Sequence, residues 1–216
     1  MKTVADLVVE ILKETGVEVL FGIPSIHNLG LYEALRKEPA IKHILCRHES
    51  TATHMADGYA REGCRLGVVI TSTGPGAGYT VPALQEALGS SVPLLVIATN
   101  ISSFKIGKGL GDLHEIPGQE EIFQKVTKGV FAVRTISDVE SMTRRALATS
   151  LAGRPGPVYL EVPTDLLTME AENKVRPVGK ASLKPAPLPN LEKAITLIRE
   201  AQNPLILVGT AALRAG

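Results

Sequence analysis

Short apolar segments alternate with amphipathic helical patterns along most of the chain, and this alternation constrains the fold more than any other feature. The segments predicted as strands are residues 19–22, 41–45, 66–71, 93–98, 126–133 and 157–162. Helical patterns lie between them, over residues 3–16, 29–36, 49–62, 74–88 and 137–151. Strands that are apolar throughout are buried on both faces, as in parallel sheets covered by helices. The pattern therefore predicts an α/β fold with three layers (α/β/α) and a doubly wound, mainly parallel sheet.

The composition agrees with such a core and excludes several classes of protein. Hydrophobic residues make up 44% of the chain and aromatic residues only 4%, which suits a core of Val, Ile, Leu and Ala. A net charge of +1 gives no basic footprint for nucleic acid or for an anionic membrane. The N-terminus enters a helix directly, with no signal peptide pattern and no apolar run long enough to span a bilayer. The two cysteines make no disulfide framework, and we expect a cytoplasmic protein without a membrane segment.

The domain organisation changes after the last predicted strand. We expect residues 1–165 to form the first domain and residues 166–189, which are rich in proline, to form a linker. Residues 190–216 hold one helical pattern (191–201) and one strand-like run (204–209). One helix and one strand cannot bury a core of their own, so this segment reads as the truncated start of a central α/β domain.

Glu49 stands where a buried strand gives way to a helix, at the end of the sheet where open α/β folds bind ligands. Its neighbours Ala52, Thr53 and Ala56 are small or apolar, so we expect partial burial to raise the pKa of its carboxyl group. Such a group can hold or share a proton near neutral pH. The alternative is a glutamate in the first turn of a helix that only favours the helix dipole.

A glycine-rich turn, Gly74-Pro75-Gly76-Ala77-Gly78, follows the third predicted strand and precedes a helix. No Lys-Ser or Lys-Thr pair follows it, which excludes a nucleotide triphosphate loop. It is either a tight strand-to-helix turn or a place where the backbone must approach a ligand closely. Neither interpretation excludes the other.

The two blocks together resemble a known family. The run Arg47-His48-Glu49, then Ala52, then His54-Met55-Ala56-Asp57-Gly58-Tyr59-Ala60-Arg61, and the second block Thr71-Ser72-Thr73-Gly74-Pro75-Gly76-Ala77 are similar to the pyrimidine-binding N-terminal domain of thiamine diphosphate enzymes. The acetolactate synthases, pyruvate decarboxylases and benzoylformate decarboxylases belong to this group. Pro93-Leu94-Leu95 and Arg154-Pro155-Gly156-Pro157-Val158 match later landmarks, so the resemblance covers nearly the whole chain.

The resemblance implies roles for individual residues. Glu49 would be catalytic, hydrogen-bonded to N1′ of the aminopyrimidine, so that N4′ takes the proton from C2 of the thiazolium. The residues that it implies around the cofactor are Pro24, Ser25, Glu49, Thr73, Gly74, Pro75, Gly76 and Tyr79. The residues that it implies near the substrate are Ile26, His27 and His114. A plain solvated loop histidine stays an equal alternative for His114.

Three positions depart from the family pattern. Ser25 stands where glycine is usual, and Tyr79 where an asparagine is common. Ile26 stands where pyruvate decarboxylases place an acid and benzoylformate decarboxylase a serine. An acid there helps to release an aldehyde, so its absence argues against a simple pyruvate decarboxylase.

The implied activity is that of the N-terminal portion of an acetolactate synthase-like enzyme that acts on a 2-keto acid through the C2 ylid and an enamine. A 2-keto-acid decarboxylase and a non-catalytic or split-subunit module are the alternatives. The family holds Mg²⁺ and the diphosphate through a Gly-Asp-Gly…Asn segment in another domain, and the sequence has no Gly-Asp-Gly. We therefore expect no metal ligands in this chain, no activity from it alone, and a homodimer or homotetramer with its active site between subunits.

Overall fold

The computed structural model describes residues 1–63, 65–171, 191–209 and 212. The chain divides into two compact units, Met1–Arg176 and Pro177–Gly216. The first unit holds a six-stranded sheet in the order β2-β1-β3-β4-β6-β5, and every strand pair is parallel. The strands are β1 (Val19–Gly22), β2 (Lys42–Leu45), β3 (Gly67–Thr71), β4 (Leu94–Asn100), β5 (Gly129–Ala132) and β6 (Val158–Pro163).

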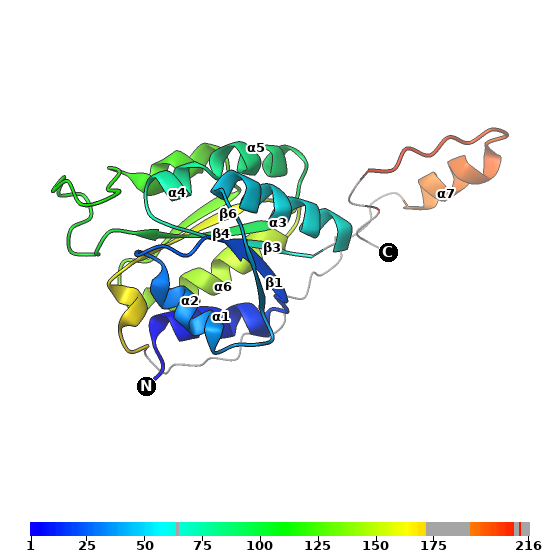
Figure 1. Ribbon diagram of the computed structural model, residues 1–216. Coiled ribbons are helices and arrows are strands. Elements are labelled where there is room, and N and C mark those ends of the chain that lie inside the picture. The colour runs from blue at the N-terminus through cyan, green and yellow to red at the C-terminus, as the bar shows by residue number, and fades with distance from the viewer. Residues whose placement is uncertain (64, 172–190, 210–211, 213–216) are drawn as a thin grey trace. The chain divides into compact units, whose positions relative to one another are not determined.

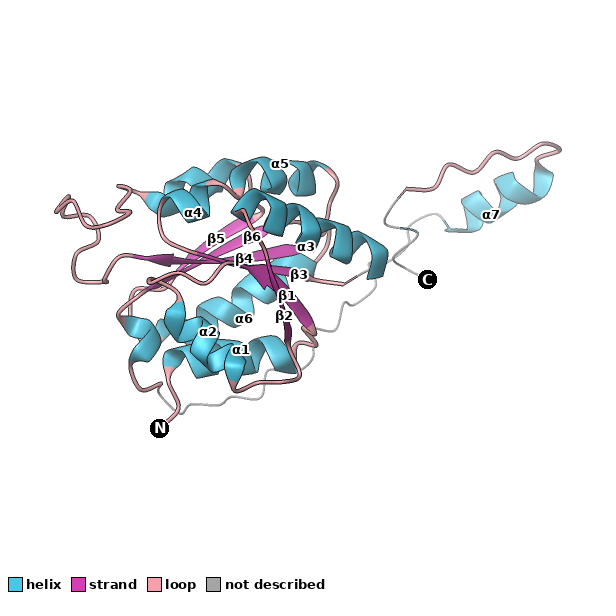
Figure 2. Cartoon of the chain, viewed as in Figure 1, coloured by secondary structure: helices cyan, strands magenta, loops and turns pink. Residues whose placement is uncertain are grey.

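Helices cover both faces of this sheet, as Figures 1 and 2 show. One face carries α1 (Val4–Glu14), α2 (Leu29–Arg36) and α6 (Asp138–Leu151), and the other carries α3 (Glu49–Gly63), α4 (Pro75–Gly78) and α5 (Val81–Gly89). Two hydrophobic clusters, one on each face, bury strand side chains that alternate between the faces. The predicted three-layer, doubly wound α/β fold is confirmed, and the sheet is parallel throughout.

The winding direction reverses between β1 and β3, which lie side by side. The segment after β1 leads to α2 on one face, and the segment after β3 leads to α4 and α5 on the other. The two connections leave the carboxyl ends of neighbouring strands for opposite faces of the sheet, and open α/β sheets bind ligands at such a point.

Two short 3₁₀ helices have no counterpart among the predicted elements. The first, η1 (Gln119–Lys125), occupies the end of the long segment after β4, and β5 begins later than the predicted strand 126–133. Its buried residues are Gln119 and Phe123, too few to give a periodic pattern. The second, η2 (Leu166–Thr168), lies inside the expected linker, yet Leu166 and Leu167 belong to the core of the first unit. The rest of that linker, residues 172–189, lies outside the described residues.

The second unit contains α7 (Leu191–Glu200), which buries none of its residues. The predicted strand over residues 204–209 is wrong, because the structure assigns no strand there. Leu205 and Leu207 are 87% and 92% exposed. A strand exists through its pairing with a neighbour, and an apolar run by itself supplies none.

Candidate functional site

Glu49 opens α3 just beyond β2, and its carboxylate faces the glycine-rich turn after β3. A Cβ atom placed on Gly76 would lie 3.3 Å from Glu49 Oε1 and 3.0 Å from the Cβ of Ser72. Any side chain at position 76 would therefore press on the carboxylate. Glu49 itself is half-buried, and Ala52, one turn further along α3, is fully buried. The two parts of the predicted site meet in the fold.

The turn itself requires glycine at its first position. Gly74 has φ +58° and ψ −111°, a conformation that residues with a side chain rarely adopt. A Cβ atom there would lie 2.1 Å from the carbonyl oxygen of His114. Next to it, the hydroxyls of Thr73 and Thr99 are hydrogen-bonded at 3.0 Å. The turn is thus a tight strand-to-helix connection, and at Gly74 its backbone closely approaches the backbone of His114.

Pro75 and Tyr79 lie on the outside of this turn. Pro75 is exposed at the first position of α4, and Tyr79 follows α4 with 52% of its surface exposed. The ring of Tyr79 lies against that of His48, with 4.8 Å between their centroids. Tyr79 therefore packs on the residue next to Glu49 and remains accessible.

The loop after β1 contacts the segment that leads into the glycine-rich turn. Ser25 donates a hydrogen bond to the hydroxyl of Ser72 at 2.8 Å, which ties the loops after β1 and β3 together. The side chain of Asn28 holds the loop in shape, because it accepts from the Ser25 backbone N–H at 2.7 Å and donates to the Ile23 carbonyl at 3.1 Å. Pro24 is exposed at the tip of the loop.

The predicted substrate residues lie together. The rings of His27 and His114 are 5.3 Å apart, and Ser72 Oγ lies 3.4 Å from His27 Nδ1. Burial, and then the nearby charge of His114, lower the pKa of His27 below its usual value. His114 is exposed and has φ +66°, an uncommon backbone conformation for a residue with a side chain. Ile26 is 72% exposed beside His27.

A cavity of about 350 Å³ opens beside these residues. It is lined by Ile26, His27, Ile101, Ser102, Lys105, Asp112, Leu113 and Thr164. Lys105 and Asp112 form an ion pair of 2.8 Å on its wall. The long segment after β4 thus contributes both an apolar and a charged wall to this cavity, as expected of a binding loop.

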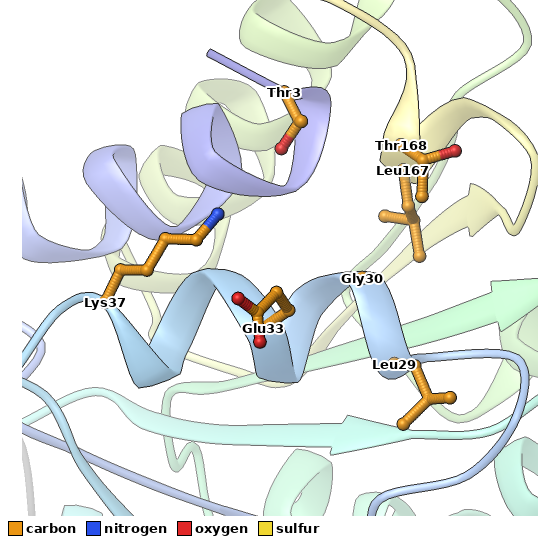
Figure 3. A pocket seen from close by; sticks show the side chains of 7 residues that line it. All are labelled: Thr3, Leu29, Gly30, Glu33, Lys37, Leu167 and Thr168. Atoms are coloured by element: carbon orange, nitrogen blue, oxygen red, sulfur yellow. The ribbon is translucent and has the colours of Figure 1, made fainter. Parts of the chain in front are cut away.

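A second hollow, of about 270 Å³, lies between the start of α1, α2 and η2 (Figure 3). It is lined by Thr3, Leu29, Gly30, Glu33, Lys37, Leu167 and Thr168. Its two charged residues have partners on the surface, since Lys37 pairs with Asp6 and Glu33 with Arg36. None of the predicted site residues lines it.

Sequence reasoning missed a buried polar network behind the glycine-rich turn. The Gln119 side-chain oxygen accepts from the Gly74 N–H at 2.6 Å, and its amide nitrogen lies 3.1 Å from Glu161 Oε2. Glu161 is fully buried and also bonds to Asn100 and Arg134. Burial raises the pKa of the Glu161 carboxyl group above its usual value. The signal that could have revealed the network is Glu161 itself, because a charged residue inside an otherwise apolar strand needs polar partners when it is buried.

The structure also bears on metal and membrane binding. Within residues 1–63 and 65–171 and the described part of the second unit, no three His, Cys, Asp or Glu side chains come close enough together to hold a metal ion. Among the helices that the structure describes, none combines the length and hydrophobicity needed to cross a lipid bilayer.

Comparison with known proteins identifies the family. The family described as "Thiamine pyrophosphate enzyme, N-terminal TPP binding domain" matches residues 2–125, more than half of the chain. The chain belongs to this thiamine pyrophosphate enzyme family. Its matched part runs from α1 to the end of η1, and so includes Glu49, the glycine-rich turn and the cavity loops of the thiamine pyrophosphate-binding fold.

The relatives are long enzymes with two kinds of names. The chain is 34% identical to the acetolactate synthase large subunit of Lactococcus lactis, over 95% of the chain and 36% of the relative. It is 35% identical to the probable 2-ketoarginine decarboxylase of Pseudomonas aeruginosa, over 99% of the chain and 38% of the relative. The chloroplastic acetolactate synthase of Arabidopsis thaliana is 33% identical, over 98% of the chain and 32% of that relative. The chain thus spans less than two fifths of the length of these relatives.

Proposed function

We propose that the chain supplies the aminopyrimidine side of a thiamine diphosphate site in an enzyme that acts on 2-keto acids, with Glu49 as the proton-relay residue. The observation that carries this proposal is the short distance between Glu49 Oε1 and Gly76. A side chain at position 76 would fill the space in front of the carboxylate. The Glu49 carboxylate faces the backbone of Gly76 near the place where the strand order of the doubly wound sheet reverses. One edge of a flat, nitrogen-rich ring fits against such a carboxylate.

The residues present fit the cofactor. When bound, thiamine diphosphate supplies a nucleophilic carbon that adds to the carbonyl group of a 2-keto acid. Glu49 would hold a proton at N1′ of the aminopyrimidine, and the Thr73–Gly76 turn with Tyr79 would border the ring. Pro24 and Ser25 would border the ring from the loop after β1, which is hydrogen-bonded to Ser72. The carbonyl compound would bind in the cavity lined by Ile26, His27 and Leu113, the residue before His114.

Glu49→Gln in the full-length protein tests the assigned role. A glutamine keeps the shape of the side chain but neither gives nor takes the proton, so we expect exchange of the C2 proton of bound thiamine diphosphate to slow by about a hundredfold or more. Proton NMR after a deuterium pulse measures this exchange. The control is Glu62→Gln, an exposed glutamate in the last turn of the same helix. Exchange at the parent rate in the Glu49 variant would refute the proposal.

A second candidate, a 2-keto-acid decarboxylase, is favoured by the relative with that printed name, which is as similar to the chain as the acetolactate synthases are. The two activities differ in their product. A decarboxylase releases an aldehyde, and a carboligase joins the activated fragment to a second carbonyl compound. We place the carboligase first because Ile26 offers no acid at the exposed rim of the cavity. Product analysis of the full-length protein with single 2-keto acids and with pairs of them distinguishes the two.

We also propose that Mg²⁺ and the diphosphate are held outside this chain, and that the enzyme is a homodimer or homotetramer with its site between subunits. Two observations support the first part of this proposal. The sequence contains no Gly-Asp-Gly segment, and the chain corresponds to only about a third of its relatives. On this proposal the 216-residue chain is inactive alone.

A further inference from the structure

The buried side chain of Gln119 connects the glycine-rich turn to strands β4 and β6. Its side chain is 1% exposed, in the first turn of η1. Its oxygen accepts from the Gly74 N–H at 2.6 Å, while its nitrogen lies 2.9 Å from the Thr99 carbonyl oxygen and 2.8 Å from the Tyr159 hydroxyl. One amide therefore binds the backbone of the glycine-rich turn, the end of β4 and a side chain of β6.

The orientation of this amide is fixed by its backbone partners. A backbone N–H can only donate and a carbonyl can only accept, so the Gln119 oxygen must face Gly74 and its nitrogen must face Thr99. The second hydrogen of the nitrogen is shared by Tyr159 and Glu161 Oε2, at 2.8 Å and 3.1 Å. A carboxylate in place of the amide could not satisfy both backbone groups unless it carried a proton.

Gly74 is also the point where the long segment after β4 touches the turn. The carbonyl oxygen of His114 occupies the space that a Cβ on Gly74 would fill. The chain then runs from His114 through Gly118, which has φ +60°, directly into Gln119. A shift of Gln119 must therefore move the turn opposite Glu49 and the loop that carries His114 together.

We propose that Gln119 is a positioning residue. It holds the Thr73–Gly76 backbone in place opposite Glu49 and couples this backbone to the loop that carries His114. It acts through the Gly74 N–H and touches neither substrate nor cofactor. This role rests on the proposed function, because the turn matters for catalysis only if it borders the aminopyrimidine. The coupling of the turn to the loop stands on the hydrogen bonds alone.

Gln119→Glu in the full-length protein tests this role through pH. The new carboxyl group would face Glu161 and Tyr159 of β6, with Glu120 beside it on η1, Arg134 bound to Glu161, and the His114 loop above Gly74. Burial and the neighbouring carboxylates raise the pKa of such a group. At low pH the protonated form donates to the Thr99 carbonyl oxygen and accepts from the Gly74 N–H, as the amide does. At high pH the carboxylate still accepts from Gly74, but it has no hydrogen to donate to Thr99 and its charge meets that carbonyl oxygen.

We expect Gln119→Glu to bind thiamine diphosphate, in the presence of magnesium chloride, about tenfold more weakly than the parent near pH 8 and within about threefold near pH 5.5. Hydrogen exchange in the cofactor-free protein should show faster exchange of residues 74–79 and 101–118 at the higher pH only. Gln119→Met keeps the volume without the hydrogen bonds, and its loss should be the same at both pH values. Gln124→Glu, an exposed glutamine of the same 3₁₀ helix, should match the parent throughout.

Parent-like exchange in both Gln119 variants would overturn the proposal, as would a loss in Gln119→Glu that does not depend on pH. If the parent itself fails to bind thiamine diphosphate, the proposed function fails. The exchange measurements, made without cofactor, then still decide whether Gln119 couples the turn to the loop.

Discussion

Glu161 is a fully buried carboxyl group within β6, and its ionisation links folding to pH. Burial is the main cause of its raised pKa, and Glu120 adds to it, whereas Asn100 and Arg134 act in the opposite direction. A carboxyl group whose pKa is higher in the folded state stabilises the fold at low pH. That contribution is complete below the unfolded pKa, about 4.3, and is lost as the pH rises through the folded pKa.

Glu161→Gln should therefore remove one component of the pH dependence of unfolding. We expect the free energy of unfolding of the variant, relative to the parent, to increase as the pH rises from about 4 toward neutrality. Urea unfolding of both proteins across this range measures the difference, which cancels the carboxyl groups common to both. Glu62→Gln, at an exposed site, should give a flat difference. A flat difference for Glu161→Gln would mean that Arg134 compensates fully for the burial of the charge.

Gly74→Ala should destabilise the first unit by about 2 kcal/mol or more, because the residue has a positive φ and its new methyl group would meet the His114 carbonyl oxygen. Gly78, four residues further on, has nothing within 4 Å of a Cβ position and lies in α4. Gly78→Ala should therefore change stability by less than about 1 kcal/mol. Thermal unfolding of the two variants compares them directly, and equal effects would contradict the geometry of the turn.

The sequence predicted which segments meet at the site better than which side chains connect them. Glu49 and Gly76 belong to two local patterns, each following a predicted strand, and the family resemblance implied that the two patterns meet at one site. The hydrogen bonds that Gln119 and Ser72 make gave no such signal. Each is an ordinary polar residue in a connection, and its partner lies more than forty positions away in the sequence. Contacts of this kind are set by the packing of the whole unit.

At the scale of single elements, the N-termini of α1 and α6 differ in whether a side chain caps the helix. Thr3 precedes α1 in a complete capping box, in which its hydroxyl accepts from the Asp6 N–H and Asp6 accepts from the Thr3 N–H. Ser137 precedes α6 without any side-chain bond to the helix. The two positions carry similar residues, yet only one satisfies backbone groups that the helix leaves open.

Thr3→Ala should cost about 1 kcal/mol of stability, and Ser137→Ala should cost clearly less. The reason is that Ser137 loses only an exposed hydrogen bond to the Thr135 hydroxyl. Denaturant unfolding of the two alanine variants tests this expectation. Equal losses would show that the capping box of α1 contributes nothing beyond a surface hydrogen bond.

The strands β3, β4 and β6 were predictable because burial on both faces leaves a largely apolar run. The edge strands β2 and β5 are less buried, yet all six strands agree with the predicted segments to within a few residues. The 3₁₀ helix η1 was not predictable, because its seven residues make too few turns to show a period. The prediction of a strand over residues 204–209 was wrong for a different reason. The apolar residues there have the pattern of a strand, but pairing depends on a neighbour that the described residues do not provide.

At the scale of the whole molecule, the first unit holds its own core. All the residues of the two hydrophobic clusters lie between Val4 and Ala171, and α7 buries none of its side chains. A chain shortened to residues 1–176 should therefore unfold with a midpoint within about 2 °C of the 216-residue chain. Calorimetry measures the two midpoints. A large decrease would show that the second unit stabilises the first.

The same organisation predicts how the cofactor binds. If Mg²⁺ and the diphosphate are held outside this chain, the isolated 216 residues retain only the aminopyrimidine contacts and lose the charged part of the binding energy. We expect titration calorimetry with thiamine diphosphate and magnesium chloride to give tight, saturable binding to the full-length protein, and binding to the isolated chain no stronger than that of thiamine. Thiamine, which has no diphosphate, should bind weakly to both and so distinguish the two parts of the ligand. Full affinity in the isolated chain would place the diphosphate site within these residues, and the proposed sharing of the active site would then be wrong.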